Sequence, residues 1–294
     1  MKSLIKQLPI VSQLLRLRRS ASHFLAQSES CAGTQEIQAL LKMTYKSYKT
    51  EGIKPSFHDV GFRRYSQFEE DGILLLIFSL IGEESRKVVE VCCGDGQQSM
   101  AANLIVNHGW QGLLFEGDLA LVKAAQSFYK RQSDCLLNQP IIKQAWITAE
   151  SINSLIAEGG YSGEVDLLSL DIDGNDYWVW KAIDKISPRV CVFETHNIIP
   201  SNLALTIPYD PNFRKDITDF HSASLLAITK LSKEKGYRLI GAHRHGFNAF
   251  FMRNDVGTDI FPEVSVESVH DNCFTRWSQA NRWPKVKHLG WQEV

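Results

Sequence analysis

Short apolar runs alternate with helical stretches over the central part of the chain. The runs are continuous rather than alternately apolar and polar, as expected of strands that helices cover on both faces. They are Val88 to Cys93, Gly112 to Glu116, Ile141 to Trp146, Val165 to Ile172 and Val190 to Thr195. Helical periodicity falls between and after them, at Gln97 to Asn107, Leu119 to Arg131, Ala149 to Glu158, Asp176 to Lys185 and Ser222 to Lys235. This alternation predicts an α/β fold with a mostly parallel, doubly wound sheet.

Two more apolar runs, Tyr237 to His243 and Asn248 to Arg253, end this part of the sequence. The short link between them suits a hairpin of antiparallel strands. We therefore predict a Rossmann-like sheet of roughly seven strands with a terminal antiparallel hairpin. The most apolar run, Ile73 to Ile81, is about half a membrane span and is predicted to be a core helix.

The pattern also indicates how the chain is divided. Residues 1–64 are predicted to form a helical N-terminal extension and residues 65–255 the domain that holds the sheet. Residues 256–294 are predicted to form a tail packed on that domain. The tail carries Trp277, Trp283 and Trp291, large side chains that favour burial.

The N-terminal segment combines basic residues with apolar positions at helical spacing. No acidic residue precedes Glu29. The basic residues are Lys2, Lys6, Arg16, Arg18 and Arg19, and the apolar ones are Leu4, Ile5, Leu8, Val11, Leu14 and Leu15. We favour a peripheral helix packed on the domain. A helix that contacts a membrane surface or a partner protein, or an organelle transit peptide, would show the same pattern.

Composition narrows the classes of function. The 32 Lys and Arg residues balance 33 Asp and Glu residues, which argues against a strongly basic nucleic-acid binder. No apolar run reaches the roughly 18 residues of a membrane span, so a transmembrane protein is not expected. The six cysteines lack the spacing of zinc ligands, and three of them fall in strand-like apolar runs. Buried thiols fit a reducing compartment, so we expect a cytoplasmic protein.

The segment from Lys87 to Ser99, KVVEVCCGDGQQS, places a glycine turn between a strand and a helix. Glycines let a ligand approach the backbone closely, and the start of a helix offers unpaired amides. Glu116 ends the next predicted strand, 20 residues after Gly96. A carboxylate there can accept hydrogen bonds from both hydroxyls of a ribose. Strand, turn, helix and acid in this order predict an adenosine-type ligand.

These residues resemble the first motif of class I S-adenosylmethionine-dependent methyltransferases, an acid followed by alternating glycines, here Glu90 to Gly96. More narrowly, the chain is similar to the FkbM-type methyltransferases over about Tyr65 to Arg253. The similar segments are YSQFEEDGIL from Tyr65, VVEVCCGDGQQS from Val88, VDLLSLDIDGNDYWVW from Val165 and VCVFETHN from Val190. The chain departs from the family pattern at Cys92, which replaces the first glycine and would narrow the space near the methionine part of the cofactor.

The resemblance implies S-adenosyl-L-methionine as the cofactor and assigns residues to it. Glu90, Gly94 and Gly96 would line its amino-acid end, and Glu116 would hold the ribose. The Trp146 and Ile147 region would approach the adenine, although the position also suits a core tryptophan. Asp171 would lie on the cofactor side of the same edge.

A second polar segment, LSLDIDGNDYW, ends the fourth predicted strand, at the edge where open α/β sheets bind ligands. It contributes Asp171, Asp173 and Asp176, and the end of the fifth strand beside it contributes Glu194, His196 and Asn197. Carboxylates this close repel one another, so a cation, a protonated partner or a shared proton must offset their charge. The group suits a divalent cation held by Asp171, Asp173 and Asn197, or an acid–base site. Without a function, the same residues would cap helices and close turns.

We predict an O-methyltransferase that acts on a hydroxyl of a sugar, a glycan precursor or another small metabolite. This substrate class rests on the family analogy alone. The predicted catalytic residues are His196, Asp171 and Asp173: either neutral His196 removes the hydroxyl proton, or a metal on the aspartates activates the hydroxyl. With His196 as the base, activity should rise through a pKa near the ordinary histidine value of about 6.5.

Three other functions remain open. A catalytically degenerate cofactor-binding module would act through the basic N-terminal helix. An NAD-dependent oxidoreductase would use the same turn and acid, although Ser99 stands where the third glycine of its motif is expected. A nucleotide-sugar glycosyltransferase would bind a metal through Asp171 and Asp173, but it does not need the turn at Gly94.

Overall fold

The computed structural model of the chain describes residues 32–294. The basic segment, with its predicted contact to a membrane surface or a partner, lies in residues 1–31, outside the described residues. Within residues 32–294, no helix has both the length and the hydrophobicity that crossing a lipid bilayer requires.

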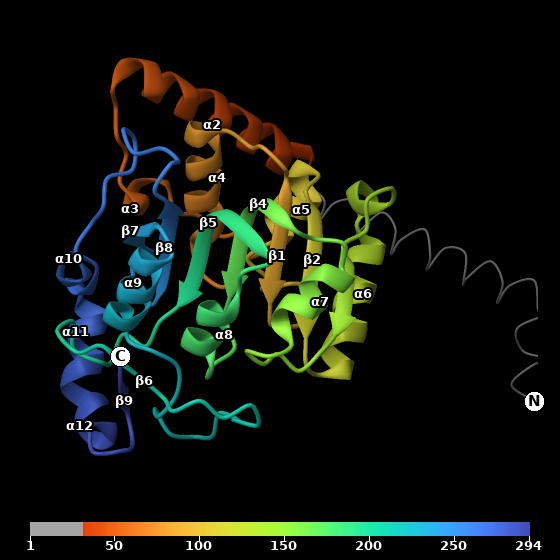
Figure 1. Cartoon of the computed structure of the whole chain (residues 1–294). Coiled ribbons are helices and arrows are strands. Elements are labelled where there is room, and N and C mark those ends of the chain that lie inside the picture. Colours follow the sequence, from red (N-terminus) through yellow and green to blue (C-terminus); the bar gives the residue numbers. More distant parts are fainter. Residues whose placement is uncertain (1–31) are drawn as a thin grey trace, which may run out of the picture.

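Seven strands form one mixed sheet in the order β3-β2-β1-β4-β5-β8-β7 (Figure 1). Their bounds are Lys87–Val91 for β1, Gln111–Glu116 for β2, Ile141–Gln144 for β3, Gly163–Leu170 for β4, Ile186–Glu194 for β5, Tyr237–Ala242 for β7 and Asn248–Arg253 for β8. All neighbours pair in parallel except β8, which runs antiparallel to both β5 and β7. The predicted doubly wound fold and its terminal antiparallel hairpin are thus confirmed. The order places the end of β1 between the ends of β2 and β4. At this point the direction in which strands are added to the sheet reverses, and ligands bind beside such points in α/β sheets.

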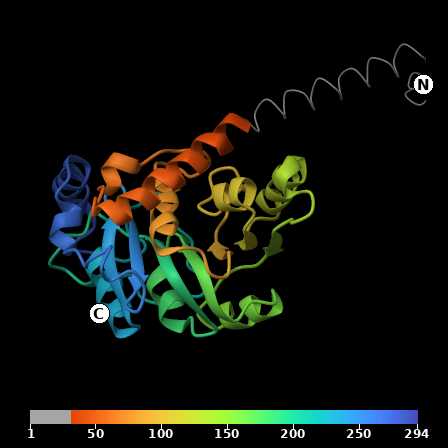
Figure 2. The same ribbon diagram turned by 90° about the horizontal axis from the view of Figure 1, so that it is seen from above.

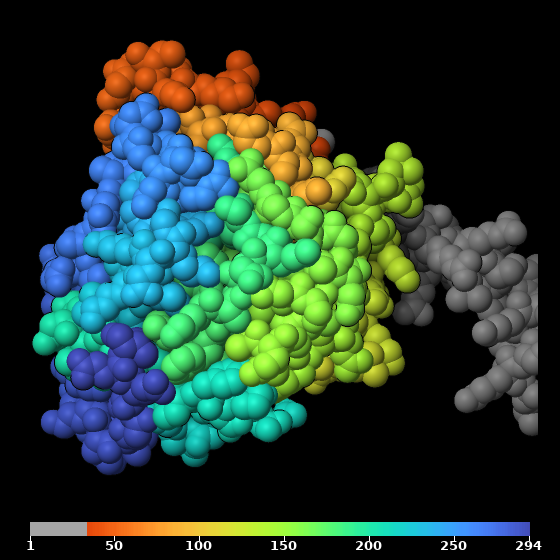
Figure 3. All heavy atoms as spheres, in the orientation of Figure 1, coloured from red at the N-terminus to blue at the C-terminus, as the bar shows by residue number. Residues whose placement is uncertain are grey.

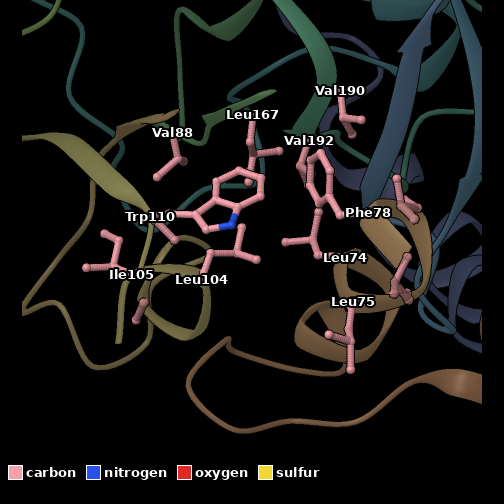
Figure 4. Packing of buried hydrophobic residues seen from close by; sticks show 14 of the residues in the cluster. Leu74, Leu75, Phe78, Val88, Leu104, Ile105, Trp110, Leu167, Val190 and Val192 are labelled. Carbon is pink, nitrogen blue, oxygen red and sulfur yellow. The ribbon is translucent and has the colours of Figure 1, made fainter. Parts of the chain in front are cut away.

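Helices cover both faces of the sheet, because successive strand residues point to opposite sides. One face carries α4 Glu70–Ile81, α5 Ala102–His108 and α6 Leu119–Arg131, followed by the short 3₁₀ turn Ser133–Cys135; the other carries α7 Ile152–Glu158, α8 Asp176–Ala182 and α9 Leu225–Glu234. Val88 belongs to the core under the first set of helices, and Val89 to the core under the second. In the first core the rings of Trp110 and Phe78 meet edge to face, 4.7 Å apart (Figure 4). Burial on both faces explains the continuous apolar runs.

Segments before and after the sheet pack around this core. α2, Ala32–Glu51, lies along α4 on the outside, and α3, Phe57–Val60, follows it (Figures 1 and 2). After β8 come α10 Val266–His270, α11 Cys273–Asn281 and α12 Trp283–Val286. The short strand β9, Gln292–Glu293, then pairs antiparallel with β6, Leu205–Thr206. The sequence did not predict these last helices or this small sheet, and the division at residues 64 and 255 stays a prediction.

A buried ion pair ties the start of the sheet together. Asp166 of β4 accepts Nη1 of Arg189 of β5 at 2.7 Å, and both side chains are almost fully buried. The same carboxylate accepts backbone amides from residues 84–86, in the loop that enters β1, at 2.7 to 3.2 Å. Removing one member of such a pair leaves the other charge buried without compensation.

Replacing Asp166 by Ala should therefore lower the free energy of unfolding by about 3–5 kcal/mol. Urea-induced unfolding followed by circular dichroism measures the change. The control is Glu263→Ala, which breaks a solvent-exposed pair with Lys233 and should cost about 1 kcal/mol or less. Equal losses from the two substitutions would contradict the importance given to the buried pair.

Candidate functional site

The turn that follows β1 has a backbone conformation that glycine normally supplies. Cys92, Gly94 and Gly96 all have φ in the left-handed region, at 65°, 56° and 79°. A Cβ on Gly96 would lie 3.2 Å from Ala125 and Tyr129 of α6, so only glycine lets that helix pack closely on the turn. A Cβ on Gly94 would meet nothing within 4 Å, which leaves room for a ligand.

The carboxylate of Glu90 is bound by its own chain. It accepts hydrogen bonds from the Ser99 hydroxyl and from the two backbone amides that follow, at 2.5 to 3.1 Å. Burial, partly offset by these hydrogen bonds, raises the pKa of Glu90 to about 7. Because Glu90 captures these amides, α5 begins at Ala102 and not at Gln97, where the sequence predicted its start. Glu90 therefore stabilises the segment that follows the glycine turn.

Glu116 joins the end of β2 to the same turn. Its Oε2 accepts the amide of Gly94 at 3.0 Å, and its Oε1 accepts the amide of Asp118 at 2.9 Å. Each carboxylate oxygen can accept a further hydrogen bond, and the side chain lines a cavity. The geometry is thus compatible with the predicted role of Glu116 at a ribose.

That cavity, of about 300 Å³, opens at the carboxyl ends of β1, β2 and β3. Ile147 supplies part of its apolar wall, and Trp146, which is 48% exposed, forms one side. The Arg214 guanidinium lies 4.5 Å from the Trp146 ring centroid, and the indole nitrogen donates to the Pro211 carbonyl oxygen at 2.8 Å. Trp146 is thus no core residue: it fastens the loop of residues 207–224 to the cavity. This loop lies along the carboxyl edge of the sheet, in teal in the lower part of Figures 1 and 3.

Three carboxylates meet beside this cavity, at the ends of β4 and β5. Oxygen atoms of Asp171, Asp173 and Glu194 lie within 4.8 Å of one another. Asp171 and Glu194 share a hydrogen bond, and Asp173 forms an ion pair with Lys215 of the loop. The structure thus brings the predicted Asp171 and Asp173 together and adds Glu194 and Lys215 to them.

A proton and a lysine offset the repulsion in this cluster. Burial and then the charge of Asp171 raise the pKa of Glu194 well above its ordinary value, so Glu194 keeps its proton and donates it to Asp171. Burial also raises the pKa of Asp171. Burial opposes the charge on Lys215, but the hydrogen bond and charge of Asp173 outweigh it and raise the lysine pKa.

Asp176 closes the turn between β4 and α8. Its carboxylate accepts the amides of Ile172 and Gly174 at 2.8 and 3.0 Å. Burial and then the charge of Asp171 raise the pKa of Asp176 to about 7. Asp176 therefore has the structural role that the sequence offered as its alternative.

His196 is 5% exposed, and its ring lies 4.1 Å from that of His221. Its Nε2 lies 2.7 Å from the carbonyl oxygen of Asp219, which can only accept, so Nε2 carries the proton and Nδ1 is free of one. Burial and then the His221 ring lower the pKa of His196 to about 3. This pKa lies well below the ordinary value of about 6.5 expected for His196 from the sequence, because burial disfavours the charged ring.

The side chain of Asn197 is engaged elsewhere. Its Nδ2 donates to the His245 carbonyl oxygen and to the Thr275 hydroxyl, both at 3.1 Å. These contacts fasten the tip of the β7–β8 hairpin to α11. The acidic group with suitable spacing for a cation joins Glu194 to the predicted Asp171 and Asp173, and the predicted role of Asn197 stays a prediction.

Sequence analysis missed three residues that shape the site, Phe213, Arg214 and Lys215. They come from an irregular part of the loop of residues 207–224, away from any motif. The sequence held one indication of them: the adjacent cations Arg214 and Lys215 fall in the segment that links β5 to α9. That segment starts at the carboxyl edge of the sheet. Such a segment is well placed to compensate the acids there.

No family model matches the sequence, and no curated protein does. Among solved structures, an S-adenosylmethionine-dependent methyltransferase from Clostridium acetobutylicum aligns with 62% of this chain and 90% of its own, at 10% identity and a TM-score of 0.41. An O-methyltransferase from Bacillus cereus in complex with SAH aligns with 76% of this chain and 90% of its own, at 13% identity and a TM-score of 0.42. The CcbJ methyltransferase from Streptomyces caelestis aligns with 60% and 92%, at 9% identity and a TM-score of 0.37. These likenesses concern the general fold alone.

Cys92, which stands where the family pattern has glycine, borders the cavity with a left-handed backbone. Cys92 is exposed as a residue, but atoms of the cavity wall surround its thiol; loss of hydration and then the charge of Glu116 raise the pKa of that thiol. The thiol is therefore a neutral wall of the cavity and a poor nucleophile.

Cys92→Gly should be more stable than Cys92→Ala by about 1–2 kcal/mol, because both remove the thiol and only glycine adopts this φ without strain. Denaturant unfolding of the two variants measures the difference. An alanine variant as stable as the glycine variant would show that the backbone at Cys92 is not strained.

Proposed function

We propose that this chain is an S-adenosyl-L-methionine-dependent methyltransferase that methylates a hydroxyl of a sugar, a glycan precursor or another small metabolite. One observation carries the proposal: two cavities meet at one charged group. Lys215 lines the cavity that holds Glu116 and also a second cavity beside Glu194. A cofactor in the first cavity and an acceptor in the second would meet at the carboxylates that end β4 and β5.

The first cavity has the chemistry that the cofactor requires. Glu116 would accept the ribose hydroxyls, and Ile147 and Trp146 would flank the adenine. Asp171 lies beside Glu194, which lines the second cavity, and a carboxylate there would favour a positively charged sulfonium. Gly94 leaves the turn open on the side that the amino-acid end would approach.

The second cavity, of about 210 Å³, has walls suited to a small hydroxyl-rich molecule. Phe247 and Phe274 supply aromatic surface, and His196, His221 and Arg282 supply polar groups. A sugar ring presents an apolar face and a polar rim, so such a mixture can bind both. This is the feature that favours a sugar-like acceptor.

We propose Asp171 as the base for the acceptor hydroxyl. When bound, the cofactor would supply the methyl group and leave as a neutral thioether. Asp171 would take the hydroxyl proton as the methyl group is transferred, and the proton shared with Glu194 would keep the pair from carrying two adjacent charges. Holding the two reactants in line can contribute roughly 7–11 kcal/mol to the barrier reduction. His196, with Nδ1 unprotonated, is the alternative base.

A divalent cation fits this cluster poorly. Carboxylates are the ligands that such ions prefer. Here, however, Asp173 is paired with the Lys215 ammonium, and Glu194 is held in its protonated form. A cation would have to displace the lysine and the proton, so we propose that the reaction needs no metal.

A cytoplasmic location is proposed on the state of the cysteines. Cys93, Cys135 and Cys191 are buried free thiols. Their burial and their lack of disulfides fit a reducing compartment. A contact of the basic segment in residues 1–31 with a membrane surface or a partner remains a prediction.

Isothermal titration calorimetry should detect S-adenosylhomocysteine, and Glu116→Gln should weaken its binding by about 1.5–3 kcal/mol because ribose loses hydrogen bonds to a charged group. Glutamine keeps one oxygen for the Gly94 amide, so the turn should survive. Glu51→Gln, an exposed acid at the end of α2 that lines neither cavity, is the control. Tighter binding of NAD or of a UDP-sugar would replace the proposed function with one of its rivals.

Asp171→Asn should lower kcat by about 10²-fold or more while affinity for S-adenosylhomocysteine persists, since a general base contributes this much. Activity should be present above the apparent pKa of the Asp171–Glu194 pair and lost as pH falls through it, because the base must be deprotonated. Methyl transfer to a metabolite or glycan pool, with and without EDTA, provides the assay.

His196→Gln tests the alternative base in the same assay. If it abolishes turnover and Asp171→Asn does not, His196 is the base. If EDTA abolishes turnover and a divalent cation restores it, the site uses a metal and the role given to Lys215 is wrong.

A further inference from the structure

We propose that a third, arginine-rich cavity beside the Gly94–Gly96 turn binds an oxyanion, a carboxylate or a phosphate, of the ligands that this enzyme uses. The cavity has a volume of about 480 Å³ and is distinct from both cavities described above. Arg63, Arg64 and Arg131 line it together with Gln98 of the turn. Only the identity of the ligand rests on the proposed methyltransferase function.

Three segments of the chain are held together to form this cavity. Asp71 of α4 accepts the backbone amides of Arg64, Tyr65 and Ser66 at 2.6 to 2.9 Å, which fixes the loop that carries the arginines. The Tyr65 ring meets Phe128 of α6 edge to face, 5.7 Å apart. The loop before α4 is therefore fastened to α6.

The glycine turn is fastened to the same helix. Gly96 packs against Ala125 and Tyr129 so closely that a Cβ would be 3.2 Å from them. Gln98, two residues after Gly96, lines the cavity together with Arg131, which stands in the last turn of α6. The cavity is thus built by ordered contacts from three directions.

The charged residues that line the cavity are all arginines, and the acids near its residue Tyr65, which are Asp71 and Asp134, lie outside the lining. None of its lining residues is acidic. Across residues 32–294, neither Arg63 nor Arg131 forms an ion pair; Arg131 donates to the neutral Ser127 hydroxyl at 3.0 Å. The nearest acid of the turn, Asp95, already accepts the backbone and side-chain nitrogens of Gln97 at 2.9 and 2.8 Å.

Arg63 and Arg131 line the same cavity without a carboxylate partner in the described part of the chain, and an anion bound there would be attracted by both. The planar fork of arginine also matches the two oxygens of a carboxylate or phosphate. The position of Arg131 also has a purely structural explanation, because the helix dipole favours a cation in the last turn of a helix. Arg64 lies over the ring of Tyr65, 4.6 Å from its centroid. Neither explanation covers Arg63, which comes from a loop on another segment.

Two sources of the oxyanion follow from the position beside the turn. The resemblance places the amino-acid end of S-adenosylmethionine at Gly94, so its carboxylate is one source. A phosphate on the acceptor is the other. Both would be recognised by the same arginine chemistry, and they are separable by experiment.

The test compares wild type with the double variant Arg63→Gln and Arg131→Gln, both exposed positions whose replacement should leave the fold intact. Three probes are titrated by calorimetry: S-adenosylhomocysteine, methylthioadenosine, which lacks the amino-acid carboxylate, and inorganic phosphate. If the cavity holds the cofactor carboxylate, the double variant weakens S-adenosylhomocysteine at least tenfold and leaves methylthioadenosine within about twofold. If it holds a phosphate, wild type binds phosphate, the double variant does not, and both nucleosides are unaffected.

Lys130→Gln is the matched control, since it removes a cation from the same helix end and does not line the cavity. An equal loss in this variant would mean a diffuse charge effect and would overturn the site. The same conclusion follows if the double variant matches wild type with all three probes, or if wild type binds none of them. Failure of wild type to bind either nucleoside would remove the proposed cofactor alone, and the phosphate titration would still decide the site.

Discussion

The repulsion between carboxylates at the ends of β4 and β5 is the constraint on which the site depends. Each acid there is compensated by a different means: Glu194 by a proton shared with Asp171, Asp173 by Lys215, and Asp176 by two backbone amides. Because Lys215 comes from the loop of residues 207–224, that loop must lie against the edge of the sheet for the charge on Asp173 to be tolerated. The same lysine lines two cavities, so the electrostatics of the edge also fixes where the cavities meet.

Buried carboxylates also fix the conformation of the loops around the sheet. Asp71, Glu90, Glu116 and Asp166 each accept backbone amides from a loop next to a strand or helix. A buried amide without a partner is costly, and a carboxylate can satisfy several at once. Loops held in this way are rigid enough to position a ligand, as Glu116 shows by holding the Gly94 turn while it lines the cavity.

The fold was predictable because its signal is local and repeated. Strands buried on both faces read as continuous apolar runs, and the helix at Leu119–Arg131 begins at the residue that the periodicity gave. The helix predicted from Gln97 starts later, because Glu90 captures its first amides through a contact that periodicity cannot show. The closeness of Asp171 and Asp173 was predictable from their place after the fourth strand, but not its cause: β4 ends at Leu170, and a left-handed turn at Asp173 brings the two together. Lys215 and the low pKa of His196 were not predictable, since both depend on how an irregular loop folds back and on burial in three dimensions.

Backbone strain in this chain gathers where the two cavities meet. Among residues 32–294, four non-glycine residues have φ in the left-handed region, and Cys92, Asp173 and Ser222 of these belong to the proposed site. Each such residue costs roughly 1–2 kcal/mol relative to an unstrained backbone, and glycine would remove that cost. Glycine would also remove the side chain of Cys92 from the cavity wall, the carboxylate of Asp173 that pairs with Lys215, and the hydroxyl of Ser222 that lies 3.0 Å from His221 Nδ1.

Strain at functional positions persists when the surrounding contacts over-determine it. Here those contacts are the ones that shape the cavities, so the strained backbone and the proposed chemistry have the same structural cause.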